Sequence, residues 1–154
     1  MRMYMDQLLD AKSQSEDRKQ NVRNEVRGVA YLYVKVTNTH RAVQWYEANL
    51  GCHVKQLNEG YACLRLPWGP QLELVLGNPS TNDIVFGLYA PNLEAYHSRM
   101  RDNGVQVEEI VGQGDCGLLF NMYDPDGNKI EVWSGYKGGG QGEVDQWIQS
   151  QQYV

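Results

Sequence analysis

Apolar and polar residues alternate along residues 26–36, the segment VRGVAYLYVKV. One face of this segment, read as an extended chain, is aliphatic and comprises Ala30, Leu32, Val34 and Val36. The opposite face carries Tyr31, Tyr33 and Lys35. A period of two is typical of a strand with one buried face, because successive side chains point to opposite sides of a sheet. The pattern therefore predicts a half-buried strand.

A helix is predicted directly after this strand, over residues 40–50. Asn38 and Thr39 are suited to cap its N-terminus, and Gly51 is suited to end it in the left-handed conformation. Its apolar stripe is formed by Ala42, Val43, Tyr46 and Leu50. Three short strands are predicted next, at about 53–57, 61–66 and 71–76.

The same order then returns in the second half of the chain. A strand is predicted over 82–90, a helix capped by Asn92 over 93–103, and strands over 105–111, 117–123 and 129–133. The two halves also share the motif P-x-G-x-x-[LI]-E-[LV], which begins at Pro67 and again at Pro125. Repetition of both order and motif indicates an internal duplication. The predicted fold class is therefore α+β, built from two βαβββ modules.

Both ends of the chain fall outside this repeat. Residues 1–25 are predicted to be a helical or flexible extension, with Met1, Met5 and Leu8 on an apolar face. Residues 135–154 comprise a glycine-rich tether at 138–142 and then a short helix or tail, in which Val144, Trp147 and Ile148 have helical spacing. The glycines lack a strand-to-helix context and a following Lys-Ser/Thr pair, so no nucleotide cofactor is expected.

Composition excludes several classes of protein. The chain has 154 residues, of which 42% are hydrophobic and 21% charged, as in ordinary globular domains. Its net charge of -5 argues against a nucleic-acid partner, whose phosphates require basic residues. No apolar run approaches the roughly 20 residues of a membrane span, and no secretory signal is recognised. Three cysteines without a C-x-x-C motif fit reduced thiols, so a cytoplasmic location is expected.

The non-aliphatic faces of the predicted strands are rich in aromatic and polar residues, as in small-molecule sites. If the aliphatic faces meet the helices, these residues line a cleft. The candidate substrate-binding residues are Tyr31, Tyr33, Lys35, Tyr61, Arg65, Tyr89, Asn121, Tyr123 and Trp133. None of the three histidines falls on this face. The sequence thus predicts an aromatic cleft for a small ligand.

Three carboxylates, Glu73, Asp83 and Glu131, lie on the same face within apolar runs. Carboxylates that converge in a cleft repel one another, so the charge must be balanced by raised pKa values, by a cation or by nearby basic residues, and a divalent ion is the simplest solution. An all-oxygen set favours a hard divalent metal such as Mg²⁺ or Mn²⁺. Ion pairs with Lys35 and Arg65 would serve without a metal, and both arrangements stay open. If a metal binds, Glu73 and Glu131 are also the candidate catalytic residues, because a carboxylate freed from the ion can move a proton.

Two longer motifs resemble signatures of the vicinal-oxygen-chelate superfamily, which includes glyoxalase I, bleomycin-resistance proteins and extradiol dioxygenases. They are Ala42-Val43-x-Trp45-Tyr46-x-x-x-Leu50-Gly51 and Tyr123-Asp124-Pro125-Asp126-Gly127-Asn128-x-Ile130-Glu131. The resemblance covers about residues 26–134, with modules at about 26–77 and 82–134. It implies curled mixed sheets that enclose a cleft, and usually a divalent metal in it.

The resemblance also implies where the metal ligands fall: at Tyr31 and Glu73 in the first module and at Asp83 and Glu131 in the second. Glu131 matches the usual glutamate of the family, and Glu73 matches the glyoxalase I pattern. Asp83 stands where histidine is common, and Tyr31 where histidine, glutamine or glutamate is common. A phenol is a poor metal ligand at neutral pH, so Tyr31 is expected to contact the ligand instead.

These residues are compatible with three functions. The first is a metal-dependent lyase or isomerase of the glyoxalase type, acting on a small oxygen-rich molecule. The second is a non-catalytic drug- or metabolite-binding protein of the bleomycin-resistance type, for which an acidic, aromatic cleft is suited. The third is a regulatory or structural module, supported by the extra segments at both ends. A homodimer is expected, because the family pairs its modules and because the apolar faces of both terminal segments require cover.

Overall fold

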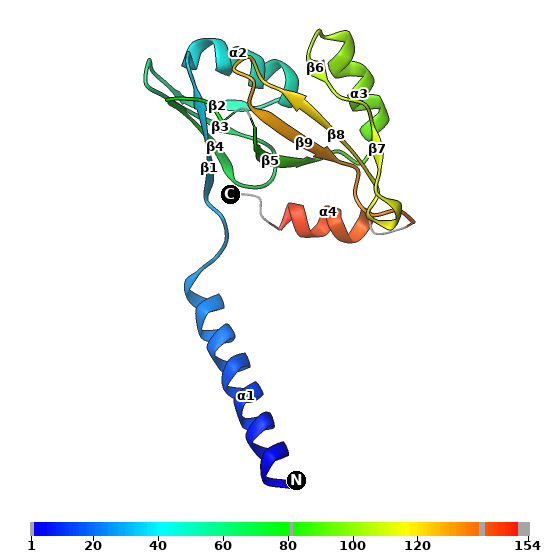
Figure 1. Cartoon of the computed structure of the whole chain (residues 1–154). Helices are drawn as coiled ribbons and strands as arrows, with labels where there is room; N and C mark the ends of the chain where they lie inside the picture. The colour runs from blue at the N-terminus through cyan, green and yellow to red at the C-terminus, as the bar shows by residue number, and fades with distance from the viewer. Residues whose placement is uncertain (1, 81, 139–140, 151–154) are drawn as a thin grey trace.

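The computed structural model of the chain describes residues 2–80, 82–138 and 141–150. The expectations for Met1, for residues 139–140 of the tether and for residues 151–154 of the tail lie outside the described residues. Figure 1 shows two sheets beside each other, with helices α2 and α3 on one side and helix α4 on the other. The predicted α+β class with two βαβββ modules is confirmed.

The first sheet is mixed and has the order β1-β4-β3-β2. Its strands are β1 (Tyr31–Val36), β2 (His53–Leu57), β3 (Tyr61–Arg65) and β4 (Gln71–Leu76), and α2 (Thr39–Leu50) connects β1 to β2. Strand β1 is shorter than the predicted 26–36. Its ladder begins where Tyr31 meets Gln71, the first residue of the parallel strand β4.

The second sheet has the order β5-β9-β8-β6, and β7 pairs with β8 off this path. Its elements are β5 (Ile84–Tyr89), α3 (Leu93–Asp102), β6 (Gln106–Val107), β7 (Val111–Gly112), the 3₁₀ turn η1 (Gly114–Cys116), β8 (Leu118–Tyr123) and β9 (Lys129–Trp133). The single strand predicted over 105–111 was wrong. From Val107 to Val111 the chain advances four residues while its partner β8 advances three, so the ladder breaks at an inserted residue.

The caps of α2 are those predicted from its sequence. The Asn38 side chain accepts a hydrogen bond from the Arg41 N–H at 2.9 Å, and Gly51 ends the helix with φ of 68°. The predicted side-chain cap at Asn92 was wrong, since Asn92 precedes α3 without a capping side-chain bond. Helix α3 is therefore held by tertiary packing and not by a side-chain cap, since Leu93 and Met100 are buried in the core.

One hydrophobic core joins the two modules. It contains Val34, Leu72 and Leu74 from the first sheet and Phe120, Ile130 and Val132 from the second. The Tyr46 ring of α2 lies 6.5 Å from the Phe86 ring of β5, centroid to centroid. The Tyr96 hydroxyl of α3 donates to the Asn49 carbonyl of α2 at 2.7 Å.

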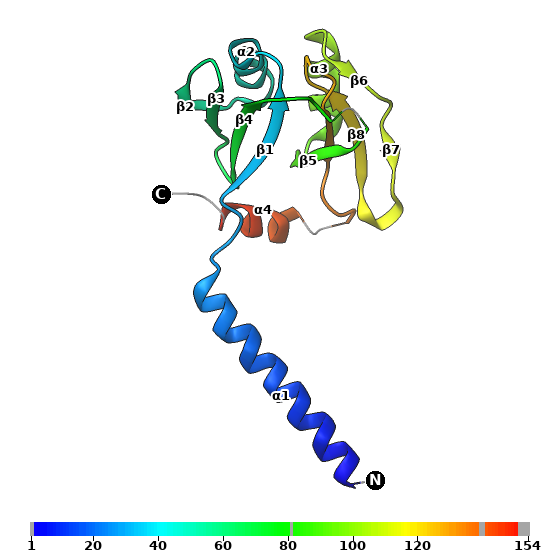
Figure 2. The same cartoon turned by 60° about the vertical axis from the view of Figure 1, so that its left-hand side comes forward.

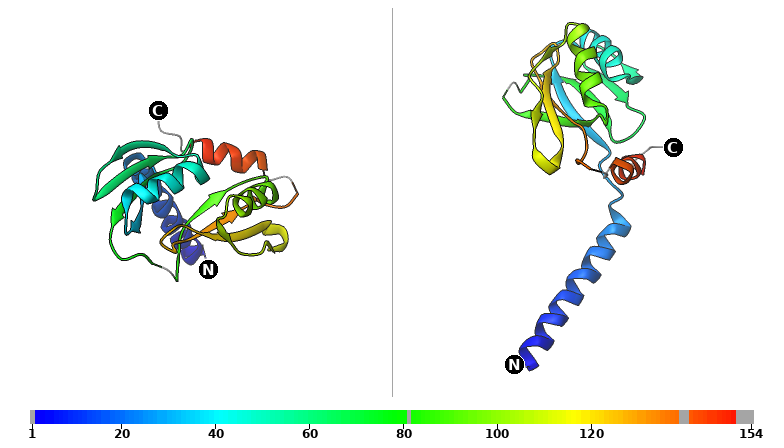
Figure 3. Two further views of the ribbon diagram at one scale, coloured as in Figure 1. Left: turned by 90° about the horizontal axis from the view of Figure 1, so that it is seen from above. Right: turned by 90° about the vertical axis from the view of Figure 1, so that its right-hand side faces the viewer.

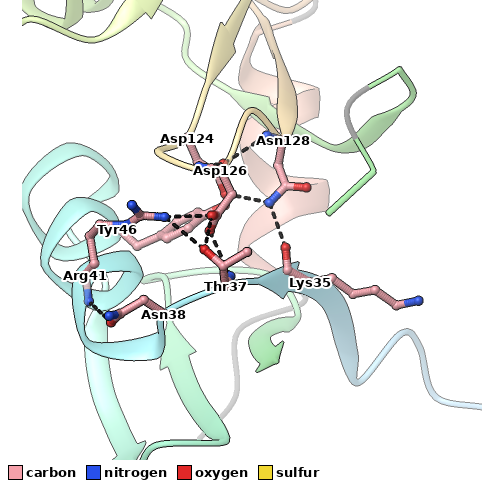
Figure 4. A network of polar contacts seen from close by, with 8 residues as sticks. All are labelled: Lys35, Thr37, Asn38, Arg41, Tyr46, Asp124, Asp126 and Asn128. Carbon is pink, nitrogen blue, oxygen red and sulfur yellow. Dashed lines mark hydrogen bonds and ion pairs between the residues drawn. The ribbon is translucent and has the colours of Figure 1, made fainter. Parts of the chain in front are cut away.

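A polar clamp between the modules surrounds the turn of residues 124–128 (Figure 4). The buried Asp124 carboxylate accepts hydrogen bonds from the Tyr46 hydroxyl at 2.9 Å and from the backbone N–H groups of Asp126 and Asn128. Asp126 pairs with Arg41 at 2.6 Å and also accepts from Thr37. The turn of the second module therefore fixes the end of β1 and the start of α2 in the first. Tyr46, Asp124, Asp126 and Asn128 of this clamp belong to the two family-like sequence motifs, whereas Thr37 and Arg41 lie outside them.

The helix α1 (Arg2–Glu25) leads away from both sheets, as Figures 2 and 3 show, and none of its residues is buried. Its apolar residues Met3, Met5 and Leu8 are all exposed. Among the described residues, no helix is both long and apolar enough to cross a membrane.

Candidate functional site

A cavity of about 710 Å³ lies against the second sheet. It is surrounded by strands β5, β8 and β9, the turn between β3 and β4, the segment around η1, and helix α4 (Gln141–Gln149), and also by Leu32 of β1 and by Tyr136. Figure 2 shows α4 beneath the sheets, on the side opposite to α2 and α3. The volume is that of a site for a drug-sized molecule.

The walls of this cavity are mainly apolar, and six of the described lining residues are aromatic. Three of the four tryptophans line it: Trp68 from the β3–β4 turn, Trp133 from β9 and Trp147 from α4. The Trp133 ring lies 5.9 Å from Tyr89 and 4.9 Å from Tyr136, and its Nε1 donates to the Cys116 carbonyl at 2.6 Å. These contacts hold Trp133 in one orientation against the cavity.

The polar groups of the cavity are few. Glu131 is the only carboxylate among the lining residues that the structure describes. It stands in β9 opposite Gly87, and the absence of a side chain there leaves space beside the carboxylate. The Tyr89 hydroxyl is buried and has no hydrogen-bond partner within the described part of the chain. Burial and the neighbouring Asp145 carboxylate of α4 raise the pKa of Tyr89. A ligand could therefore bind to both a carboxylate and a phenol.

The rim of the cavity is held by hydrogen bonds between residues 115–118 and 134–137. Leu118 and Ser134 exchange two bonds of 2.8 and 3.0 Å, and the Lys137 N–H donates to the Asp115 carbonyl at 3.1 Å. Gly117 is required here, since a Cβ would lie 1.9 Å from the Gly135 carbonyl oxygen and φ is +91°. This arrangement positions Tyr136 and the start of the segment that leads to α4.

The predicted site residues divide into two groups. Of the second module, Tyr89, Glu131 and Trp133 line the cavity. Asn121 and Tyr123 do not, because both donate hydrogen bonds to Glu108 and thereby lower the pKa of that carboxyl group. Of the first module, none of the predicted residues is among the lining residues; these are Tyr31, Tyr33, Lys35, Tyr61, Arg65 and Glu73.

The first-module residues form a separate polar surface on the first sheet. Tyr31 and Tyr33 are 47% and 62% exposed, whereas Glu73, which is paired with Tyr33 and Cys63 across the strands, is only 7% exposed. Glu73 Oε2 has no hydrogen-bond partner among the described residues. The interaction of the Tyr61 hydroxyl with the Glu73 carboxylate, followed by burial, raises the pKa of Tyr61.

The predicted metal ligands are not brought together within one chain. Asp83 is exposed just before β5, Glu73 lies on the first sheet, and Glu131 lies in the cavity. Over the described residues, no three His, Cys, Asp or Glu side chains form a group that could hold a metal. The buried oxygen of Glu73 fits a cation, but the described residues of a single chain supply no complete coordination set. The divalent metal stays a prediction.

Several cavity residues were missed from the sequence as site residues: Trp68, Tyr136, Trp147 and Ile148. The helical spacing of Trp147 and Ile148 was visible, but nothing local indicated the surface against which α4 packs. Trp68 lies between β3 and β4 and was not among the predicted site residues. Its neighbours Pro67 and Gly69 indicate the turn that carries it to the rim.

Comparisons with known proteins match the two-module part of the chain and not its terminal helices. The family model described as Glyoxalase/Bleomycin resistance protein/Dioxygenase superfamily matches residues 28–132. Helices α1 and α4 lie outside that match. A comparison of the sequence with curated proteins gave no match.

Solved structures with the same fold include binding proteins and an enzyme. TnmS3, an antibiotic binding protein from Streptomyces sp. CB03234, has 21% identity and a TM-score of 0.59, covering 70% of this chain and 95% of that one. The bleomycin-binding protein of Streptomyces verticillus, solved with copper(II)-bleomycin, has 16% identity and a TM-score of 0.57, with coverages of 70% and 95%. Lactoylglutathione lyase from Agrobacterium tumefaciens has 16% identity and a TM-score of 0.59, with coverages of 69% and 92%. At these identities the likeness concerns the fold.

Proposed function

Because the chain belongs to the glyoxalase/bleomycin resistance protein/dioxygenase superfamily, we propose that it is a small-molecule-binding protein of the bleomycin-resistance type. The ligand binds in the cavity beside β9 and is released without chemical change. The observation that carries this proposal is the composition of the cavity: its walls are apolar and rich in aromatic rings, and Glu131 is the one carboxylate among the described lining residues. Such walls provide stacking surfaces, and one carboxylate orients a positively charged group.

The structural relatives support a binding role in general terms. TnmS3 is an antibiotic binding protein, and the Streptomyces verticillus protein holds copper(II)-bleomycin. Among the described residues that line the cavity here, none is a lysine or arginine. A cationic, partly aromatic molecule therefore meets no like charge in this cavity.

Thermal-shift measurements with cationic antibiotics, run beside divalent metals, test this function. A ligand that binds only the folded state raises its Tm, by the equivalent of about 2.7 kcal/mol at a hundred times Kd. We expect Glu131→Gln, a change of nearly constant volume, to weaken binding at least about tenfold. Glu109→Gln is the matched control, since Glu109 is exposed and does not line the cavity. No shift with any antibiotic, or equal shifts for both variants, contradicts the proposal.

A metal-dependent lyase or isomerase of the glyoxalase type is the second candidate. One observation favours it: the carboxylate of Glu73 is buried with an unpartnered oxygen, which a cation would satisfy. Metal analysis of protein purified without chelator tests this candidate. A metal held by the parent and lost in Glu73→Gln supports it. A parent that takes up no Mg²⁺ or Mn²⁺ on titration removes it.

We also propose that the protein is a homodimer. The exposed apolar residues of α1 and the exposed Tyr31 and Tyr33 are surfaces that a second copy could cover. Sedimentation equilibrium at micromolar concentration distinguishes a dimer from the 17.6 kDa monomer.

A further inference from the structure

Helix α4 lies outside the part of the chain that matches the family, yet it forms one side of the cavity. Val144 is 5% exposed, so the helix is packed on the body of the protein along one face. Trp147 and Ile148, three and four residues later, lie on the same face and line the cavity. The sequence of α4 thus provides one residue for anchoring and two for the cavity wall.

Trp147 is 59% exposed although it lines the cavity, and it is the most exposed of three exposed aromatic residues there, beside Trp68 and Tyr136. Covering such a large aromatic ring is favourable, because it removes apolar surface from water. A molecule in the cavity would cover the ring. Trp147 is therefore available for contact with a ligand.

The remainder of α4 contributes negative charge. The Asp145 carboxylate is close enough to raise the pKa of Tyr89, a residue of the cavity wall on β5. Asp145 does not line the cavity itself, so it places negative charge next to the wall residue Tyr89, in addition to the charge of Glu131 inside the cavity. A planar cation can interact with an aromatic ring through its π face and with a carboxylate through its charge.

We propose that α4 is a structural wall of the ligand site and that Trp147 is a specificity-determining residue that selects planar aromatic cations. This inference rests on the proposed function, since it assumes that the cavity binds a small molecule. It adds a binding element that lies beyond the family-like domain. It also assigns a role to the C-terminal segment.

The test uses two probes of nearly equal size and shape. 9-Aminoacridine is a cation at pH 8, and acridine is uncharged at that pH. Binding to the full chain is followed by fluorescence titration. We expect Trp147→Ala to weaken the binding of 9-aminoacridine about tenfold and the binding of acridine less, because both probes lose a stacking surface but only the cation loses its attraction to the π face. Trp147→Phe should restore most of the affinity. Gln149→Ala is the matched control, since it changes an exposed residue of the same helix.

The outcomes distinguish a failure of the proposed role of α4 from a failure of the proposed binding function. Binding of 9-aminoacridine by the parent that is weaker in Glu131→Gln and in Trp147→Ala, but unchanged in Gln149→Ala, supports both. Binding that is weakened by Glu131→Gln and unaffected by Trp147→Ala overturns the role of α4 and leaves the cavity function intact. A parent that binds neither probe overturns both. Circular dichroism of each variant establishes that the fold is retained.

Discussion

The hydrogen bond between Tyr46 and Asp124 connects the two modules through the core, and its removal should destabilise the whole domain. Tyr46→Phe deletes only the hydroxyl that donates to Asp124 Oδ2 at 2.9 Å. Tyr46 is fully buried and Asp124 is 5% exposed, so water cannot replace the lost donor. The perturbation is therefore confined to one oxygen atom at the junction of the modules.

The magnitude follows from the charge of the acceptor. Hydrogen bonds to charged groups contribute about 1.5–3 kcal/mol, against about 0.5–1.5 kcal/mol for neutral pairs. Asp124 keeps three other bonds, from Asp126 N, Asn128 N and Asn128 Nδ2. The carboxylate thus stays largely satisfied, and we expect a loss of about 2 kcal/mol in the free energy of unfolding. Tyr96→Phe removes a bond to a neutral carbonyl and should lose about 1 kcal/mol.

Alkaline pH should reduce the difference between the parent and Tyr46→Phe. Burial, and then the charge of Asp124, raise the pKa of Tyr46 well above its ordinary value. In the unfolded chain a tyrosine loses its proton near pH 10. Above that pH the folded protein holds more protons than the unfolded chain, so the stability contributed by Tyr46 is lost as the pH rises. The phenylalanine variant has no such proton to lose.

Urea unfolding followed by circular dichroism, at pH 8 and at about pH 10.5, measures both effects. The m-values of parent and variants should agree, which shows that the same surface unfolds. The reasoning is refuted if Tyr46→Phe loses no more stability than Tyr96→Phe at pH 8. It is also refuted if the difference between parent and Tyr46→Phe is the same at both pH values.

Two further predictions concern the rim of the cavity and the thiols. Gly117→Ala should lower the free energy of unfolding by more than about 2 kcal/mol, because its Cβ would lie 1.9 Å from the Gly135 carbonyl oxygen. Gly112→Ala is the control: it has open space around it and should lose less than about 1 kcal/mol, and urea unfolding measures both variants. Burial, with a smaller effect of Glu47, raises the pKa of Cys52 to about 12, so Ellman's reagent at pH 8 should modify the exposed Cys116 first and Cys52 only on unfolding.

The fold was predictable from the sequence where local signals suffice. Helix α2 lies between Asn38 and Gly51, which satisfy its terminal backbone groups by local contacts. The strands of the first module follow from alternation and turn residues. Where tertiary packing decides, the prediction was wrong: Asn92 makes no capping bond, and the strand predicted over 105–111 is broken by an inserted residue.

The site was predictable only in part, for a related reason. Alternation shows on which face of a strand a side chain lies, but not what covers that face. Tyr31 and Tyr89 have the same pattern, yet only Tyr89 meets a helix, because α4 packs against the second sheet. That placement depends on contacts distant in sequence, as does the turn that carries Trp68. The sequence therefore predicted Tyr89, Glu131 and Trp133 of the cavity lining, but not Phe86 and Leu88 of β5 or the residues of the turn and α4.

The duplicated motif P-x-G-x-x-[LI]-E explains how two similar modules come to have different roles. Its variable second position is Trp68 in the first module and Asp126 in the second. Trp68 reaches the cavity beside the second sheet, whereas Asp126 reaches back to Arg41 at the start of α2. The first turn thus lines the cavity beside the second sheet, and the second turn holds the two modules together. The glutamates that end the motif diverge accordingly, because Glu131 lines the cavity while Glu73 is buried beneath Tyr33 and Tyr61.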